Sequence, residues 1–406
     1  MAAAPTVAAD RWSLRWTALA LHAVLLQCTV FVIRPTISYQ AIALGVPNAW
    51  LGCLAACFTV VPLGIALLAG RLADARGERS VLVAGAALLV TAALLFAVLP
   101  GTLPVLVAAS VLLGCGHLLT MLGQQSVVAG GEPGRDLVHA FGRFTLAQSL
   151  GQAIGPVVMG LLGGQAARPD THRLFLAGAG AAVLLAALTS FVGGRRRSGW
   201  RPRPPGGAVR TVLAVPDLRV AILASLTVIA SVDLLVVYLP VLGTEEGLAT
   251  SVVGALLTVR AVASMASRVL LARWVRRFGR PAVLVASLAG AAATVALLPV
   301  WPSVAVMGVV VVGVGLTLGV GQPMTMAWVS ESAPAPVRAT ALSLRLSGNR
   351  LGQTVLPAVA GLCAAGWGAA GVFWAMAVAL GTTGALTRRA LARPSGAAPA
   401  DPAGKV

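Results

Sequence analysis

Twelve long apolar runs follow one another along the 406-residue chain, most of them separated by short breaks of Gly, Pro and Arg. Nearly all approach or exceed the roughly 20 residues that an α-helix needs to cross a hydrocarbon core about 30 Å thick. The predicted helices are 14–38, 48–69, 81–99, 104–128, 141–163, 174–192, 218–241, 251–272, 282–299, 304–329, 339–364 and 367–387. The predicted fold class is therefore an all-α polytopic membrane protein with 12 transmembrane helices.

Polar side chains are unevenly distributed among these helices. Seven of the predicted helices carry a polar stripe, whereas 81–99, 174–192, 282–299 and 367–387 are bland. A polar stripe is costly in hydrocarbon unless it faces protein or water. We therefore expect the striped helices to surround a solvated central space and the bland helices to face lipid, an arrangement typical of a transporter.

The stripes supply candidate residues for binding a small molecule in that space. These are Arg34, Gln124, Gln148, Gln152, Asp233, Arg260, Gln322, Asn349 and Gln353. Two interpretations fit the amide side chains, since they can hydrogen-bond a substrate or simply join neighbouring helices. The arginines likewise either bind an anionic group of the substrate or act as gate residues bonded to backbone carbonyls.

Asp233 is the acidic residue that lies well inside a predicted helix. A carboxylate near the bilayer centre costs a few kcal/mol on insertion scales, so a functional role is expected. Either Asp233 exchanges a proton with the cavity, with Arg34 and His117 as partners in proton coupling, or it forms a permanent ion pair with an arginine. His117 can instead be a neutral, hydrogen-bonded residue. Glu245 falls in a loop and is expected simply to be solvated.

The net charge of +18 is arranged in a way that points to a membrane rather than to nucleic acid. Arginines concentrate in alternate loops, and the opposite set of loops holds only Arg168 and Arg173. By the positive-inside rule, both termini are predicted in the cytoplasm and the chain in the cell (inner) membrane of a bacterium. A content of 58% hydrophobic and 10% charged residues excludes an ordinary soluble protein.

The chain is written as one unit twice. A shift of 202 positions places Gly45 on Gly247 and Gly77 on Gly279. Such an internal repeat predicts two pseudo-symmetric six-helix bundles. The predicted boundaries are 1–192 for the N-terminal bundle, 193–216 for a mobile cytoplasmic linker, 217–393 for the C-terminal bundle and 394–406 for a disordered cytoplasmic tail.

Two motifs resemble signatures of the major facilitator superfamily. The first is similar to the family's loop between helices two and three, and its residues are Gly70, Leu72, Asp74, Gly77 and Arg79. The second is similar to the helix-five signature of the family's proton-driven exporters, and its residues are Gly142, Gly151, Gly155, Pro156 and Gly160. The chain thus resembles the twelve-helix branch of drug–proton antiporters within this family.

This resemblance implies a secondary active transporter that works by alternating access. The leading expectation is proton-coupled efflux of a small organic molecule. The alternatives are uptake or facilitated transport of an anionic metabolite, and a ligand sensor that does not transport. The expected partners are a small-molecule substrate, protons and the lipid bilayer, in a monomer. The sequence contains no evident nucleotide-binding loop, metal cluster or nucleophile–base pair, so no enzyme activity, cofactor or metal site is expected.

Overall fold

The computed structural model describes residues 7–99, 101–129, 137–192, 208–300, 303–333 and 338–392. Within these ranges all regular structure is helical. The helices are α1 (Val7–Ala43), α2 (Asn48–Arg76), α3 (Glu78–Val98), α4 (Leu103–Ala129), α5 (Leu137–Gly163), α6 (Thr171–Val192), α7 (Ala208–Ala214), α8 (Pro216–Glu245), α9 (Thr250–Phe278), α10 (Arg280–Leu297), α11 (Val304–Ser332) and α12 (Arg338–Leu391).

The last helix contains a sharp bend that turns it into two crossings. Trp367 and Gly368 leave helical geometry, and Gly368 has a φ of 57°, a conformation that glycine adopts without steric cost. Eleven of the described helices are long and apolar enough to span a membrane, and the last such stretch is 52 residues long. Because the bend divides that stretch, the prediction of twelve membrane helices is confirmed.

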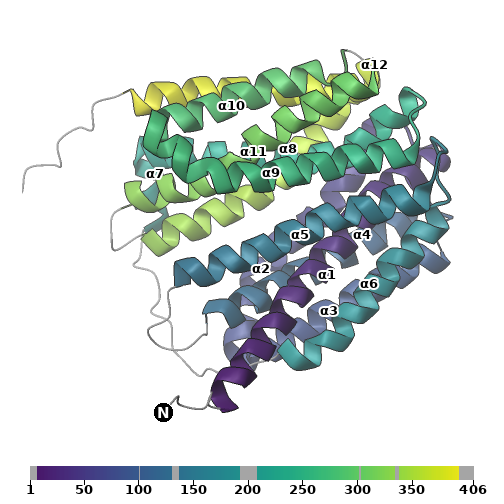
Figure 1. The fold of residues 1–406 in the computed structure, drawn as a ribbon, viewed down its shortest axis with the longest axis horizontal. Coiled ribbons are helices and arrows are strands. Elements are labelled where there is room, and N and C mark those ends of the chain that lie inside the picture. The colour runs from purple at the N-terminus through teal and green to yellow at the C-terminus, as the bar shows by residue number, and fades with distance from the viewer. Residues whose placement is uncertain are drawn as a thin grey trace, which may run out of the picture.

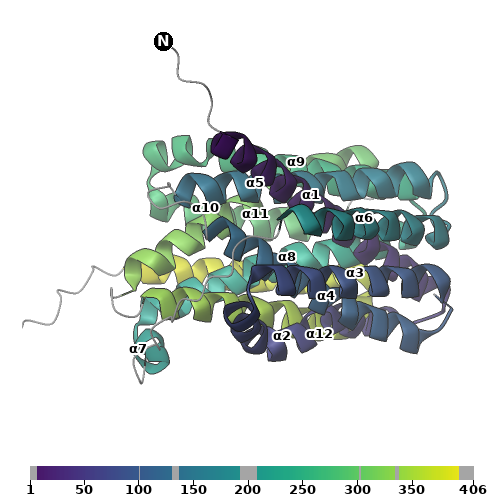
Figure 2. The ribbon, with the colours of Figure 1, turned by 90° about the horizontal axis from the view of Figure 1, so that it is seen from below.

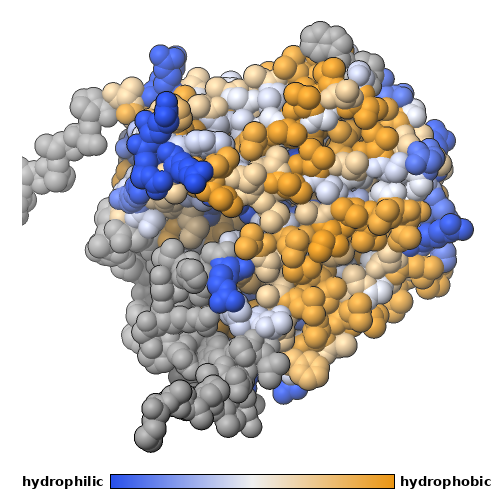
Figure 3. Space-filling view, in the orientation of Figure 1, coloured by the Kyte–Doolittle hydropathy of each residue, from blue (hydrophilic) through white to orange (hydrophobic). Residues whose placement is uncertain are grey.

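The helices form two groups, and the helix axes of the two groups point in roughly the same direction (Figure 1). We call the end where α1 begins and α12 finishes, at the left of Figure 1, the Arg280 end. The opposite end, which carries the turns at Gly45 and Gly247, is the Gly45 end. Hydrophobic residues cover the middle of the visible face, and hydrophilic residues lie towards both ends (Figure 3). This is the surface expected of a chain embedded in a bilayer.

The two groups repeat each other in detail. The turn glycines Gly45 and Gly247 have φ angles of 74° and 66°. A Cβ added at Gly114 would lie 1.9 Å from the carbonyl oxygen of Phe58, and one added at Gly315 would lie 2.4 Å from that of Arg260. Phe58 and Arg260 are themselves 202 positions apart. The same close contact between helix backbones is therefore built once in each bundle.

The bundles meet along α1 and α8, α2 and α12, and α5 and α9. Figure 2 shows α2 beside α12 and α5 near α9. The closest backbone contacts between the bundles lie towards the Gly45 end. A Cβ at Gly52 would lie 2.0 Å from the carbonyl oxygen of Pro357, and a Cβ at Gly254 would lie 2.6 Å from that of Pro156. The molecule is therefore tightly closed near this end.

The predicted linker 193–216 contains an element that the sequence analysis did not anticipate. Helix α7 covers its last part, and Val212 is fully buried against Leu218, Ile222 and Val329 of the second bundle. Val212 and the neighbouring Val215 bring apolar surface to this cluster, so the segment packs against the bundle. Residues 193–207 and the predicted tail 394–406 lie outside the described part of the chain.

Candidate functional site

Asp233 lies at the centre of the contact between the bundles. Arg34 on α1 donates a hydrogen bond from Nη1 to Oδ1 of Asp233 at 2.7 Å, and Gln353 on α12 donates from Nε2 to Oδ2 at 2.7 Å. The side chains of Arg34 and Asp233 are 6% and 8% exposed. Both carboxylate oxygens are therefore occupied, and the ion pair with Arg34 joins one bundle to the other. The pairing that the sequence analysis considered is present.

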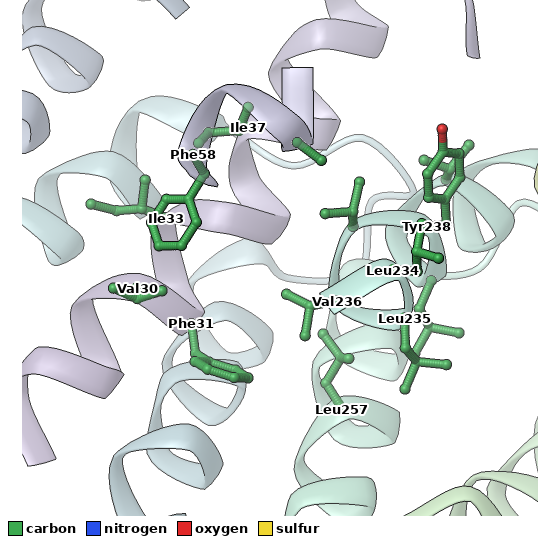
Figure 4. Packing of buried hydrophobic residues seen from close by; sticks show 14 of the residues in the cluster. Val30, Phe31, Ile33, Ile37, Phe58, Leu234, Leu235, Val236, Tyr238 and Leu257 are labelled. Atoms are coloured by element: carbon green, nitrogen blue, oxygen red, sulfur yellow. The ribbon is translucent and has the colours of Figure 1, made fainter. Parts of the chain in front are cut away.

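The ion pair is set among apolar side chains. The guanidinium carbon of Arg34 lies 4.6 Å from the centre of the Phe58 ring, a cation–π contact. Ile37 of α1 and Val236 of α8 belong to the same buried cluster as Phe58 (Figure 4). In such surroundings charges interact strongly, and a partner left alone is costly. Arg34 and Asp233 therefore depend on each other.

A small cavity opens beside Arg34. Its lining includes Ser38, Leu51, Phe58 and Ser110, and the space open to the centres of water molecules is about 20 Å³. That is room for about one water molecule. An organic substrate does not fit in it, so this cavity does not hold a substrate in the present conformation.

The second bundle contributes an excess of buried cations. Arg260 on α9 is 2% exposed, and its Nε and Nη2 atoms have no hydrogen-bond partner. Arg345 donates from Nη2 to the side-chain oxygen of Gln322 at 2.9 Å, while its Nε atom is unpartnered. Arg350 makes a long contact of 3.4 Å with Gln353. Within the described parts of the membrane-spanning helices, away from their ends, Asp233 is the one carboxylate available to these cations.

A further arginine connects the bundles on the side of Asp233 that faces the Arg280 end. Arg268 on α9 donates from Nη1 to Oγ of Ser149 on α5 at 2.5 Å. It also donates from Nε to the carbonyl oxygen of Gly319 at 3.5 Å. Arg260 lies close enough to both Arg268 and Asp233 for their charges to interact. The candidate site thus extends from Asp233 along α9.

Three predicted cavity residues are engaged inside their own bundles instead. Gln124 donates from Nε2 to Nδ1 of His22 at 2.7 Å. Gln148 contacts the sulfur of Met121 at 2.7 Å, and Asn349 accepts a hydrogen bond from Ser225 at 2.8 Å. For these residues the geometry is that of the alternative interpretation, contacts between helices. Gln152 is half-buried on α5.

His22 was not identified from the sequence. It is fully buried, and its Nε2 atom lies 3.0 Å from Oγ1 of Thr189, whose hydroxyl in turn donates to the carbonyl oxygen of Leu185. This chain is consistent with a neutral imidazole that accepts from Gln124 at Nδ1 and donates from Nε2. In the sequence, His22 is a lone polar residue away from the polar stripe that contains Arg34. Nothing in that pattern indicated that it would complete a hydrogen-bond network.

His117 has neither of the surroundings expected for it. Both of its ring nitrogens are buried without a hydrogen-bond partner, and its ring lies 5.5 Å from that of Phe58. Among the described residues no chain of hydrogen bonds links His117 to Asp233. The predicted alternative of a hydrogen-bonded histidine is wrong for this conformation, and a role in proton coupling stays a prediction.

The glycines of the helix-five motif let α5 approach two other helices. A Cβ at Gly151 would lie 2.2 Å from the carbonyl oxygen of Val24, and one at Gly155 would lie 2.7 Å from Cβ of Phe31, both on α1. A Cβ at Gly160 would lie 3.3 Å from the carbonyl oxygen of Ser251 on α9. Gly142 lies outside the residues whose surroundings are described.

The loop motif is described only in its second half. Gly77 has a φ of 84° and precedes α3, and Arg79 is exposed. This φ favours glycine, as the motif requires. The surroundings of Gly70, Leu72 and Asp74 lie outside the described part of the structure.

At the Gly45 end, a set of contacts that we call the clasp joins the bundles. Asn48 on α2 donates to Oε1 of Glu245 at 2.7 Å, and both oxygens of Glu245 accept from the backbone N–H of Ala369 at 3.1 Å. On the other side, Thr250 donates from its backbone N–H to the carbonyl oxygen of Ala166 at 2.9 Å. Glu245 is exposed, but the expectation that it is simply solvated is wrong, because its carboxylate accepts these hydrogen bonds.

The comparisons with known proteins agree with this architecture. The sequence profile of the Major Facilitator Superfamily matches residues 19–249 and 221–405. The chain is similar in structure to the nucleoside transporter NupG, with a TM-score of 0.77 and 14% identity over 94% of this chain and 100% of that one. It is also similar to the inward open conformation of the xylose transporter XylE from E. coli, with a TM-score of 0.74 and 15% identity over 95% and 98% of the two chains.

A third similar structure is a bacterial homolog of the human lysosomal transporter Spinster in an inward-facing, occupied conformation. Its TM-score is 0.69, with 17% identity over 94% of this chain and 97% of that one. A comparison with curated protein sequences gave no match. At these identities the structural similarity shows the fold alone, whereas the profile matches most of the chain. The chain therefore belongs to the major facilitator superfamily, and it is a multi-pass membrane transporter for a small-molecule substrate.

Proposed function

We propose that this chain is a secondary active transporter of the drug–proton antiporter branch, which exports a small organic molecule in exchange for protons by alternating access. The observation that carries this proposal is the Asp233 carboxylate, held between the bundles by Arg34 and Gln353. An ionisable residue in this position is both a proton site and a structural tie, and coupling requires a group that is both.

Protonation of Asp233 changes the contact between the bundles directly. The ionised carboxylate accepts from Arg34 at one oxygen and from Gln353 at the other. A proton removes the negative charge that Arg34 faces and turns one acceptor into a donor. The ion pair across the interface is then lost, and the charge of Arg34 has no counter-charge until another anion binds. Proton binding and the closed arrangement therefore oppose each other.

The positive-inside rule places the Arg280 end, and with it both termini, in the cytoplasm. The clasp and the contact of Gly52 with Pro357 then close the external side. Such a conformation is one half of an alternating-access cycle, and its next step is to release the clasp. The packing of Gly151 and Gly155 against α1 supports the antiporter branch, since these are the motif glycines that permit it.

Transport by the purified chain in liposomes tests the proposal. With a pH gradient imposed and a pH-sensitive dye inside, adding a transported compound should move protons in the opposite direction. Asp233→Asn should abolish proton movement, because the amide cannot ionise, but should retain exchange of labelled compound across the membrane. The control is Asp170→Asn, which changes an exposed carboxylate paired with Arg173. Proton movement that persists in Asp233→Asn contradicts the proposal.

The excess of buried arginines over carboxylates favours a second candidate, uptake or facilitated transport of an anionic metabolite. In the same liposomes, this function would move substrate in the same direction as protons or without any proton movement, and not in the opposite direction. Ligand binding with no flux at all would indicate the third alternative, a sensor that does not transport.

A further inference from the structure

We propose that the substrate carries an oxyanion group, a carboxylate or a phosphate-type group, and that Arg260 is the residue that binds it. This inference rests on the proposed function in that it assumes a substrate that passes through the centre between the bundles. It does not depend on the direction of transport or on proton coupling.

The repeat shows that the fold does not require an arginine at this position. Arg260 and Phe58 are equivalent residues, and each receives a glycine of the neighbouring helix against its main-chain carbonyl. In both bundles the contact uses the backbone, so the side chain is free to differ. Phe58 fills its position with an apolar ring, whereas Arg260 places a charge in an equally enclosed one.

Arg260 is held without a counter-charge of its own. It is 2% exposed, and Asp233, the carboxylate near it, already accepts from Arg34 and Gln353. Its other charged neighbour is Arg268, which repels it. A buried charge without a partner is strongly unfavourable, so its retention needs a compensating ligand in some step of the cycle.

The unpartnered atoms of Arg260 indicate the kind of ligand. Nε and Nη2 lie on the same edge of the guanidinium plane, and both are buried without a partner. That edge forms two parallel hydrogen bonds with the oxygens of a carboxylate or a phosphate, which a neutral amide or alcohol cannot match. Because the side chain is enclosed in the present conformation, the anion reaches it when the bundles part.

Thermal unfolding of the full chain in detergent, with matched acid and amide pairs, tests this inference without any gradient. The probes are aromatic and aliphatic carboxylates such as benzoate, each beside its amide such as benzamide, and phenylphosphonate to distinguish a phosphate-type group. We expect at least one acid to raise the unfolding temperature where its amide does not. In Arg260→Gln the apparent affinity for that acid should fall at least about tenfold. The control Arg388→Gln changes an exposed arginine at the end of α12 and should leave it unchanged.

Two further measurements keep the inference open to contradiction. Without ligand, Arg260→Gln should unfold at the same temperature as the natural chain or at a higher one, because the change removes an unpaired charge. Arg260→Lys keeps the charge but loses the planar edge, and should bind the acid more weakly than Arg260 does. If no acid stabilises the chain, if amides act as well as acids, or if the acid still binds Arg260→Gln with full affinity, the inference is wrong.

The outcomes also separate this inference from the proposed function. Acid binding that depends on Arg260, together with proton movement that is unaffected by Asp233→Asn, would retain the anion site and end the antiport mechanism. Proton exchange driven only by neutral compounds would retain the antiport mechanism and end the anion site.

Discussion

The interiors of the two bundles differ although their backbones repeat. In the first bundle, Gln124, His22 and Thr189 form a chain of hydrogen bonds between helices, and Phe58 occupies the position equivalent to Arg260. In the second bundle, Arg260 and Arg345 have polar atoms without partners. Glycine contacts thus preserve the fold in both copies, while the side chains on the inner helix faces have diverged. Buried polar atoms without a partner occur in both interiors, among them both ring nitrogens of His117 in the first, but in the second they belong partly to the charged side chains of Arg260 and Arg345. The two interiors therefore differ in buried charge, and the charged one is where we propose that an anion binds.

The largest effect is expected where the two interiors are joined. Arg34→Ala leaves Asp233 buried without its counter-charge, so we expect the free energy of unfolding to fall by about 3–5 kcal/mol and transport to be lost. The control Arg173→Ala breaks an exposed ion pair with Asp170 and should change stability by at most about 1 kcal/mol. Denaturant unfolding in micelles measures both. Equal effects of the two changes would show that Asp233 does not need Arg34.

Added methyl groups at the repeated contacts test whether the bundles are equivalent. Gly114→Ala and Gly315→Ala each place a Cβ against a carbonyl oxygen, at 1.9 Å and 2.4 Å before any adjustment. We expect both to destabilise the chain by about 1–3 kcal/mol or more, because the helices must move apart. Gly180→Ala meets no atom within 4 Å and serves as the control. A large loss in one bundle and none in the other would mean that the repeat is only superficial.

Removing a polar residue should have opposite consequences in the two interiors. His22→Leu leaves Gln124 and Thr189 without their partner and should cost about 1–3 kcal/mol. Arg260→Met removes a charge with no partner at Nε or Nη2 and should leave the ligand-free chain equally stable or more stable. Thermal unfolding of both variants, side by side, checks this contrast. Destabilisation by Arg260→Met comparable to that by His22→Leu would remove the difference between the bundles.

The smallest effect concerns the clasp at the Gly45 end. Glu245→Gln keeps the shape of the side chain but weakens the hydrogen bonds from Asn48 and Ala369, so the closed arrangement should lose about 0.5–1.5 kcal/mol. Faster hydrogen exchange at the start of α2 and at Ala369 would report this loss. Glu246→Gln, at the neighbouring exposed carboxylate, is the matched control and should exchange like the natural chain.

The sequence predicted the architecture because membrane helices leave long apolar runs and because repeated turns need glycine. The pair of Arg34 and Asp233 could also be anticipated, since buried charges seek each other. The roles of the amide side chains, such as that of Gln124, could not be anticipated. Whether Gln124 faces a cavity or His22 depends on the rotation of α4 by a fraction of a turn, which spacing along one helix does not determine.

Two other features needed the folded chain. The bonds of Glu245 depend on the bend at Trp367 and Gly368, which brings the N–H of Ala369 to the carboxylate. Helix α7 depends on an apolar surface assembled from Leu218, Ile222 and Val329. Both features include a partner distant in the sequence, Ala369 for Glu245 and Val329 for α7, and the local pattern carries no information about such a partner.

The unequal attachment of Glu245 has a consequence for what happens when the clasp releases. The carboxylate is bonded through both oxygens to Ala369 of its own bundle but through one oxygen to Asn48 of the other. Glu245 and Ala369 lie in the same bundle, so separation of the bundles breaks the bond to Asn48 and leaves a negative charge at the rim of the newly opened mouth. An anion that passes this mouth meets the same electrostatic repulsion in both directions, so the charge slows its passage without favouring exit over entry.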